Sequence, residues 1–209
     1  MTIKATSALS ILVIWIAAVT AVVVEHDSWW ILIFAFLATG AVGVSAWRRL
    51  GLSRLLAIAG IWGGASLAAG SDPDAAWVSI FAFLATGAVV YSSMRRDALA
   101  LGAGIVAAWL VVGVAVAVQG HGASWMAIFA FLTAGALANS GGNFARGVTG
   151  VLWWAIAGGV VLIAGAGWAW LCVPAFLLTA ASLGFSDFHL PRRVEWDLFD
   201  RDDDRDRVR

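Results

Sequence analysis

Long apolar runs separated by short polar segments dominate the chain. The first run, 5–24, holds about 20 residues, which is the length a helix needs to cross about 30 Å of hydrocarbon. Later runs of similar character follow one another with only a few polar or glycine residues between them. The pattern predicts an all-α polytopic membrane protein with eight transmembrane helices. The expected spans are 6–24, 29–47, 52–70, 76–94, 98–118, 124–139, 148–165 and 168–185.

A repeated motif organises these runs. The clearest copy is Trp77-Val-Ser-Ile-Phe-Ala-Phe-Leu-Ala-Thr-Gly-Ala88, and related copies begin at Trp30, Trp125 and Trp170. A second tryptophan series lies inside the alternate runs, at Trp15, Trp62, Trp109 and Trp154. A fixed period of about 47 residues indicates a tandem repeat, here a pair of helices.

The repeat predicts four helical hairpins, at about 6–47, 52–94, 98–139 and 148–185, in a transmembrane domain of residues 1–186. Short connections make sequence neighbours antiparallel neighbours in space. Because each repeat has an even number of helices, all four have the same orientation, related by rotation about the membrane normal. We therefore expect a compact bundle with pseudo-fourfold or paired twofold character.

Composition and charge agree with membrane insertion. The 209 residues are 62% hydrophobic and 12% charged, whereas a soluble domain has about 25% charged residues. The zero net charge gives no electrostatic basis for binding nucleic acid. Nine basic residues fall on one side of the eight-helix arrangement: Lys4, Arg48, Arg49, Arg54, Arg95, Arg96, Arg146, Arg192 and Arg193. The other side has Glu25, Asp27, Asp72 and Asp74, so the positive-inside bias predicts a multi-pass cell-membrane protein with both termini in the cytoplasm.

Residues 187–209 form a tail of mixed charge. It ends in Arg201-Asp-Asp-Asp-Arg-Asp-Arg-Val-Arg209, which is not the uniformly basic sequence of a lipid anchor. We expect a solvated cytoplasmic tail. The alternative is a docking segment for a protein partner.

Ionisable side chains are confined to loops, helix ends and the tail, apart from Cys172 and Tyr91. Proton pumps and ion-coupled transporters place such groups at membrane depth, so a carboxylate relay is not expected. We find no catalytic residue set, cofactor motif or metal motif, and predict no enzymatic activity. His26, Asp27, Asp72 and His121 would form an outer metal site only if repeats one and three met; solvated loop residues are the preferred interpretation.

Mildly polar residues at membrane depth leave two interpretations open. Thr39, Thr86 and Thr179 occupy one repeat position, with Ala134 in the third repeat, and Asn139 ends the sixth helix. These residues either line a pore or take part in helix packing, in which a threonine hydroxyl bonds the carbonyl four residues back. Small-residue stripes favour packing, for example Ala35-x-x-x-Thr39-x-x-x-Gly43 and Gly60-x-x-x-Gly64.

Paired phenylalanines recur three times: Phe34/Phe36, Phe81/Phe83 and Phe129/Phe131. Members of a pair lie about 200° apart on a helix, so we expect one to face a neighbouring helix and the other to face lipid. The single cysteine, Cys172, is expected to be a small buried hydrophobe.

Residues 55–96 carry a resemblance to a known family. Pro73 lies in the loop, Gly87 in mid-helix, and Arg95-Arg96 closes the unit. This plan resembles the tandem-hairpin HdeD-type membrane proteins of bacteria and archaea. The resemblance implies a link to acid resistance and brings no catalytic residues.

The sequence thus favours a non-enzymatic integral membrane protein with a structural, accessory or stress-tolerance role in the cytoplasmic membrane. The alternative is a channel or small-solute transporter whose pathway runs between the repeats. The lipid bilayer is the expected partner, together with a possible protein partner of the tail.

Overall fold

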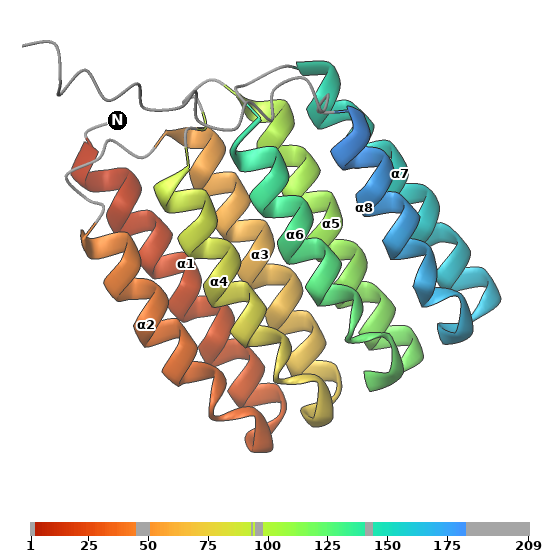
Figure 1. Cartoon of the computed structure of the whole chain (residues 1–209). Coiled ribbons are helices and arrows are strands. Elements are labelled where there is room, and N and C mark those ends of the chain that lie inside the picture. The colour runs from red at the N-terminus through yellow and green to blue at the C-terminus, as the bar shows by residue number, and fades with distance from the viewer. Residues whose placement is uncertain (1–2, 45–50, 93, 95–97, 141–143, 183–209) are drawn as a thin grey trace, which may run out of the picture.

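A computed structural model describes residues 3–44, 51–92, 94, 98–140 and 144–182 of the chain (Figure 1). Every regular element within these ranges is helical. The α-helices are α1 (Ile3–Val24), α2 (Ile31–Val44), α3 (Leu52–Ser71), α4 (Val78–Tyr91), α5 (Leu99–Gln119), α6 (Met126–Ala138), α7 (Phe144–Ala164) and α8 (Cys172–Ser182). Short 3-10 turns precede the even-numbered helices: η1 (His26–Ser28), η3 (Pro73–Ala75), η4 (His121–Ala123) and η5 (Ala166–Leu171).

The predicted all-α class is confirmed for the described residues. Six segments are long and apolar enough to cross a membrane, while the two at Ile31–Gly43 and Ala166–Ser182 are shorter. Six such segments indicate a multi-pass membrane protein. The α-helical part of each even helix begins two to four residues later than expected, because the chain first forms a 3-10 turn after each odd helix.

The helices form two parallel rows rather than a closed bundle (Figure 1). One row holds α1, α3, α5 and α7 in this order, and the other holds α2, α4, α6 and α8. Each helix packs on its neighbours in the row, and each even helix also packs on the odd helix before it. Because α1 and α7 lie at opposite ends of the row, the expected compact bundle with pseudo-fourfold or paired twofold character is wrong.

Glycine makes the row of odd helices tight. A Cβ added to Gly64 of α3 would lie 2.1 Å from the carbonyl oxygen of Trp109 in α5. A Cβ on Gly113 of α5 would in turn lie 2.6 Å from the carbonyl oxygen of Gly64. These backbones are in direct contact, as the predicted Gly60-x-x-x-Gly64 stripe requires. A side chain at either position would force the helices apart.

The even row is built differently. A Cβ added to the glycines of its helices would meet no atom within 4 Å at Gly40, Gly43, Gly87 and Gly135. Ala35, by contrast, is fully buried. The predicted stripe Ala35-x-x-x-Thr39-x-x-x-Gly43 therefore packs only in part, and its glycine does not bring two backbones together.

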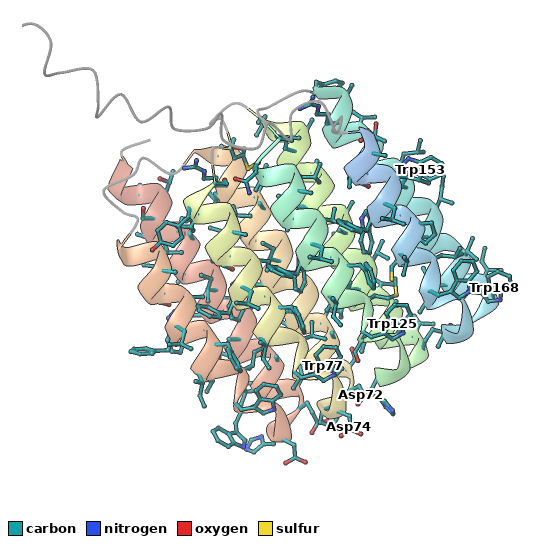
Figure 2. All side chains as sticks on the ribbon, viewed as in Figure 1. Asp72, Asp74, Trp77, Trp125, Trp153 and Trp168 are labelled. Atoms are coloured by element: carbon teal, nitrogen blue, oxygen red, sulfur yellow. The ribbon has the colours of Figure 1, made fainter. Side chains whose placement is uncertain are left out.

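Large aromatic side chains fill the space between the rows. Trp62, Trp109 and Trp154 are fully buried. Trp77 and Trp125 lie where α4 and α6 begin, and Trp153 lies toward the α7/α8 end (Figure 2). The core is consequently a slab of apolar side chains between two rows of helices.

Candidate functional site

Hydrogen bonds between tryptophan and threonine link the two rows of helices. The indole Nε1–H of Trp62 donates to the hydroxyl of Thr86 at 3.0 Å, and that hydroxyl donates to the carbonyl of Ala82 at 2.8 Å. In the first repeat, Trp15 donates in the same way to Thr39 at 3.0 Å. Thr39 donates to the carbonyl of Ala35 at 2.9 Å. Each hydroxyl thus has a donor and an acceptor inside the protein.

The third and fourth repeats depart from this arrangement. Ala134 replaces the threonine, and the fully buried Nε1 of Trp109 has no hydrogen-bond partner among the described residues. Thr133, one residue earlier, instead accepts a hydrogen bond of 3.1 Å from Trp154 of the following repeat. A one-residue offset on α6 therefore moves the hydroxyl from one tryptophan to the next.

The four residues predicted to line a pore or to pack are not gathered around one axis. Thr39, Thr86 and Thr179 lie on α2, α4 and α8, along a row. Thr86 and Thr179 are fully buried, and Thr179 donates to the carbonyl of Ala175 at 2.7 Å. Asn139 is exposed at the end of α6, where its Nδ2 donates to the carbonyl of Gly135 at 2.9 Å. The backbone bonds are those that the packing interpretation requires.

Two arginines donate hydrogen bonds to carbonyl oxygens just beyond the ends of α4 and α6, at the side of the molecule where α3 and α7 begin. Nη2 of Arg54 donates to the carbonyl oxygens of Ser92 and Met94, each at 2.9 Å, just beyond α4. Arg146 of α7 donates to the carbonyl of Ser140, just beyond α6. Cations in these places satisfy orphan carbonyls and complement the negative helix end. The tail at 187–209, His189 and the arginines at 48, 49, 95, 96, 192 and 193 lie outside the described residues.

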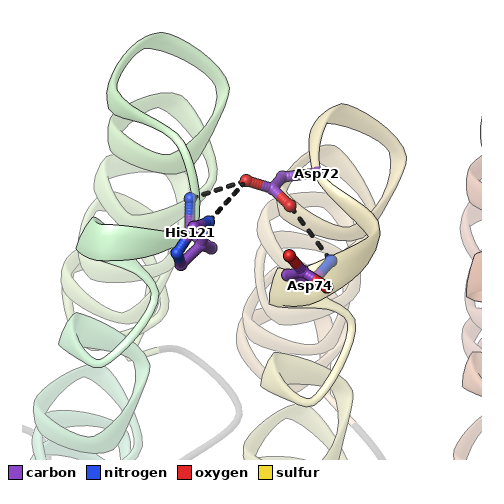
Figure 3. Close-up of side chains that lie close together, drawn as sticks. All are labelled: Asp72, Asp74 and His121. Carbon is purple, nitrogen blue, oxygen red and sulfur yellow. Dashed lines mark hydrogen bonds and ion pairs between the residues drawn. The ribbon is translucent and has the colours of Figure 1, made fainter.

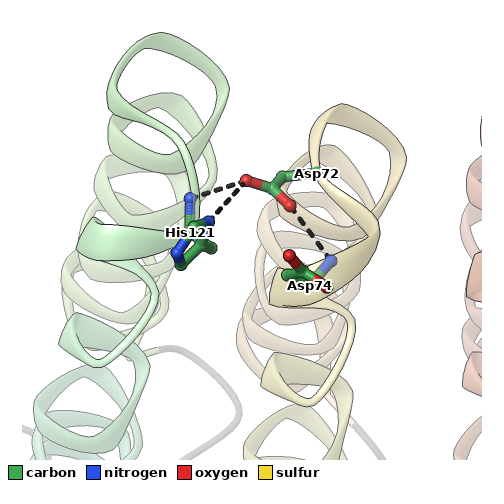
Figure 4. A network of polar contacts seen from close by, with 3 residues as sticks. All are labelled: Asp72, Asp74 and His121. Atoms are coloured by element: carbon green, nitrogen blue, oxygen red, sulfur yellow. Dashed lines mark hydrogen bonds and ion pairs between the residues drawn. The ribbon is translucent and has the colours of Figure 1, made fainter.

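Asp72 and Asp74 lie at the opposite side of the molecule (Figure 2), where they form a polar cluster with His121 (Figure 3). Oδ2 of Asp72 accepts from the backbone N–H of His121 at 2.7 Å and lies 3.3 Å from its Nδ1. Oδ1 of Asp72 accepts from the backbone N–H of Asp74 at 3.0 Å. Gly120, whose φ is +74°, turns the chain out of α5 immediately before His121. One carboxylate therefore bridges the loop after α3 and the loop after α5 (Figure 4).

The cluster joins the outer loops of repeats two and three. Solvated loop residues were the preferred interpretation of His26, Asp27, Asp72 and His121, with an outer metal site only if repeats one and three met. Consecutive pairs of helices are neighbours instead, and the partner of His121 comes from the preceding loop. Asp72, Asp74 and His121 offer ligand atoms within 4.8 Å of one another, but the His121 side chain is 66% exposed. The geometry supports a surface clasp between two loops.

Shallow grooves interrupt the apolar surface of the described residues. One, of about 190 Å³, lies between α7 and α8 and includes Trp153, Leu171 and Pro174 in its lining. Another, of about 280 Å³, lies between α5 and α7 and includes Val111 and Gly158. Neither is lined by Thr39, Thr86, Thr179 or Asn139. Cys172 is a buried free thiol, as expected.

Comparisons with protein-family models, with curated proteins and with solved structures give no match.

Proposed function

We propose that this chain is an integral membrane protein with a structural or accessory role, for stress tolerance or in support of a larger membrane complex. In this proposal all eight helices cross the cytoplasmic membrane as four hairpins of the same orientation. The ends bearing Arg54 and Arg146 face the cytoplasm, and the Asp72 cluster faces outward. The resemblance to HdeD-type proteins supports a role in acid tolerance.

The observation that carries the proposal is the hydrogen bonding of the Thr86 hydroxyl, which accepts from Trp62 and donates to the carbonyl of Ala82. A threonine in a water-filled pathway has water as its partner. Thr86 has protein partners on both sides of its hydroxyl and is fully buried. A dry interior of this kind suits a scaffold, and the proposal therefore includes no transport pathway and no catalytic chemistry.

The experiment is a cysteine accessibility scan in a Cys172→Ala background. Thr39, Thr86, Ala134 and Thr179 are replaced by cysteine one at a time and treated with a membrane-impermeant thiol reagent. Asp27→Cys, at an exposed loop position, serves as the positive control. We expect labelling at the control and silence at the other four positions.

Labelling at all four positions would instead indicate a water-filled path between the repeats. Solute-flux assays on Thr86→Val would then test the competing channel function. The scaffold proposal expects Thr86→Val to leave solute flux unchanged.

A further inference from the structure

An aromatic ladder runs along the even row and joins each repeat to the next. The ring centroids of Phe34 and Phe83 lie 6.4 Å apart, and those of Phe81 and Phe131 lie 6.1 Å apart. The same step joins Phe129 to Phe176, at 6.1 Å. Within a repeat, the first phenylalanine of a pair contacts the following repeat and the second contacts the preceding one. The expected division into a packing ring and a lipid-facing ring is therefore wrong for the inner repeats.

The ladder ends differently at the two edges of the row. At the α1/α2 edge, Phe36 has the position of Phe83, Phe131 and Phe176, but no described residue stacks on its ring from a neighbouring repeat, and its side chain is 68% exposed. At the α7/α8 edge, Pro174 occupies the position of Phe34, Phe81 and Phe129. One edge thus presents a ring without a neighbour, and the other lacks a ring.

The missing ring coincides with a groove. Pro174 lines the groove of about 190 Å³ between α7 and α8, together with Trp153, Leu171, Leu178 and other apolar side chains. Trp153 stands at this edge of the row (Figure 2). Trp153 directly precedes Trp154, one of the tryptophans that recur in each repeat. The equivalent residues of the other three repeats are fully buried: Ile14, Ile61 and Ala108. The groove therefore occupies the place where each inner repeat receives its successor.

We propose that this groove binds the Phe36 ring of a second copy of the chain, so that copies associate head to tail in the plane of the membrane. Phe36 and the groove lie at matching depth, because the rings at these two repeat positions meet at every internal step. The contact continues an interface that the chain already makes three times within itself. The inference requires the helices to lie in a membrane, but it does not depend on the accessory role proposed above.

The odd row limits the strength of this association. Gly113 and Gly158 let α5 and α7 approach the preceding odd helix, and a Cβ on Gly158 would lie 2.8 Å from the side chain of Val111. The same repeat position in α1 is Val19, which is 46% exposed. The Val19 side chain therefore keeps α1 of the second copy farther from α7 of the first copy than neighbouring odd helices are from each other within one chain. We therefore expect reversible association through the even row, in an open head-to-tail chain.

Photocrosslinking of the full-length chain in lipid vesicles tests the proposal. Phe36 is replaced by the photoreactive amino acid benzoylphenylalanine, which keeps an aromatic ring at this position. The control places the same amino acid at Leu84, which is 42% exposed on α4 in the interior of the row. We expect dimers and larger multiples from position 36, with the crosslinks mapping between residues 153 and 178, and monomers from position 84.

A groove-filling variant makes the test specific. Leu178 lies on the groove and is 40% exposed, so Leu178→Trp fills it without altering the core. With an aromatic contact contributing about 0.5–1.5 kcal/mol, the yield of crosslinked multimers should fall up to about tenfold. Monomers carrying lipid adducts would mean that lipid fills the groove and would overturn the proposal. So would dimers crosslinked only between α1/α2 edges, equal crosslinking from position 84, or an unchanged yield in Leu178→Trp.

Discussion

The Trp62–Thr86 hydrogen bond allows a quantitative test of how the two rows are held together. Valine has nearly the shape of threonine, so Thr86→Val removes the hydroxyl and its hydrogen bonds without opening a cavity. The Nε1–H of Trp62 then becomes a fully buried donor without an acceptor. Such a group costs about 1–3 kcal/mol in soluble proteins, whereas hydrogen bonds measured within membranes average about 0.6 kcal/mol and reach about 1.7. We expect Thr86→Val to lower the free energy of unfolding by about 1–1.5 kcal/mol.

The assay is reversible unfolding in mixed detergent micelles, followed by far-ultraviolet circular dichroism. Thr86→Ser keeps the hydroxyl and should recover most of the lost stability. A double-mutant cycle with Trp62→Phe separates the pair from other effects of each change. In the Trp62→Phe background the indole donor is absent, so Thr86→Val should cost much less.

Trp109 provides an internal comparison, because its Nε1 has no partner among the described residues. Trp109→Phe removes a similar volume from a buried site but breaks no hydrogen bond. A coupling energy near zero in the Trp62/Thr86 cycle would refute the reasoning. It would mean that the hydroxyl is used only by its own helix.

Further substitutions test the helix contacts and the Asp72–His121 contact by the same unfolding assay. Gly64→Ala should destabilise the protein by more than about 2 kcal/mol, because its Cβ would lie 2.1 Å from a backbone oxygen. Gly87→Ala has open space and should stabilise by up to about 1 kcal/mol through helix propensity. Equal effects of the two substitutions would contradict the close packing of the odd row. Ala134→Ser restores a hydroxyl at the repeat position that pairs with tryptophan in the first two repeats, so it should provide an acceptor for Trp109 and stabilise by about 0.5–1 kcal/mol. A loss of stability would show that the site has no room for one more atom. His121→Ala should cost under about 0.5 kcal/mol, because its exposed ring is the weaker part of the clasp and its backbone N–H still binds Asp72. Asp72→Asn should cost more than His121→Ala, since one of its two acceptor atoms becomes a donor facing an N–H, and the reverse order would argue against the clasp.

Much of the helical architecture follows from the apolar pattern. The period of the tryptophans fixed where each helix lies to within a few residues, and the stripe at Gly60 and Gly64 correctly predicted a close seam. The row arrangement could not be predicted in the same way. A hairpin can follow its neighbour around a ring or along a line, and the choice depends on how deeply each helix sits on the next. Gly113 and Gly158 allow close approach of the odd helices, yet in the sequence they resemble Gly87, where an added Cβ would meet no atom within 4 Å.

The polar contacts could be predicted from the sequence only in part. Equal sequence separation of Trp15 from Thr39 and of Trp62 from Thr86 is a pattern from which the paired hydrogen bonds could have been inferred. The exchange of partners at Thr133 could not, because it depends on a single residue of offset around α6. The Asp72–His121 contact was not predicted, because charge and spacing do not show which outer loops are adjacent.

The open row has a consequence for how such a chain is made and how it changes. Within the described residues, each pair of helices packs mainly on the pair before and the pair after it, so stability is approximately a sum of local terms and nearest-neighbour terms. Gene duplication can therefore lengthen the row, and deletion can shorten it, without disturbing the pairs that remain. Each hairpin can also dock as it leaves the translocation machinery, because its partner has already been synthesised.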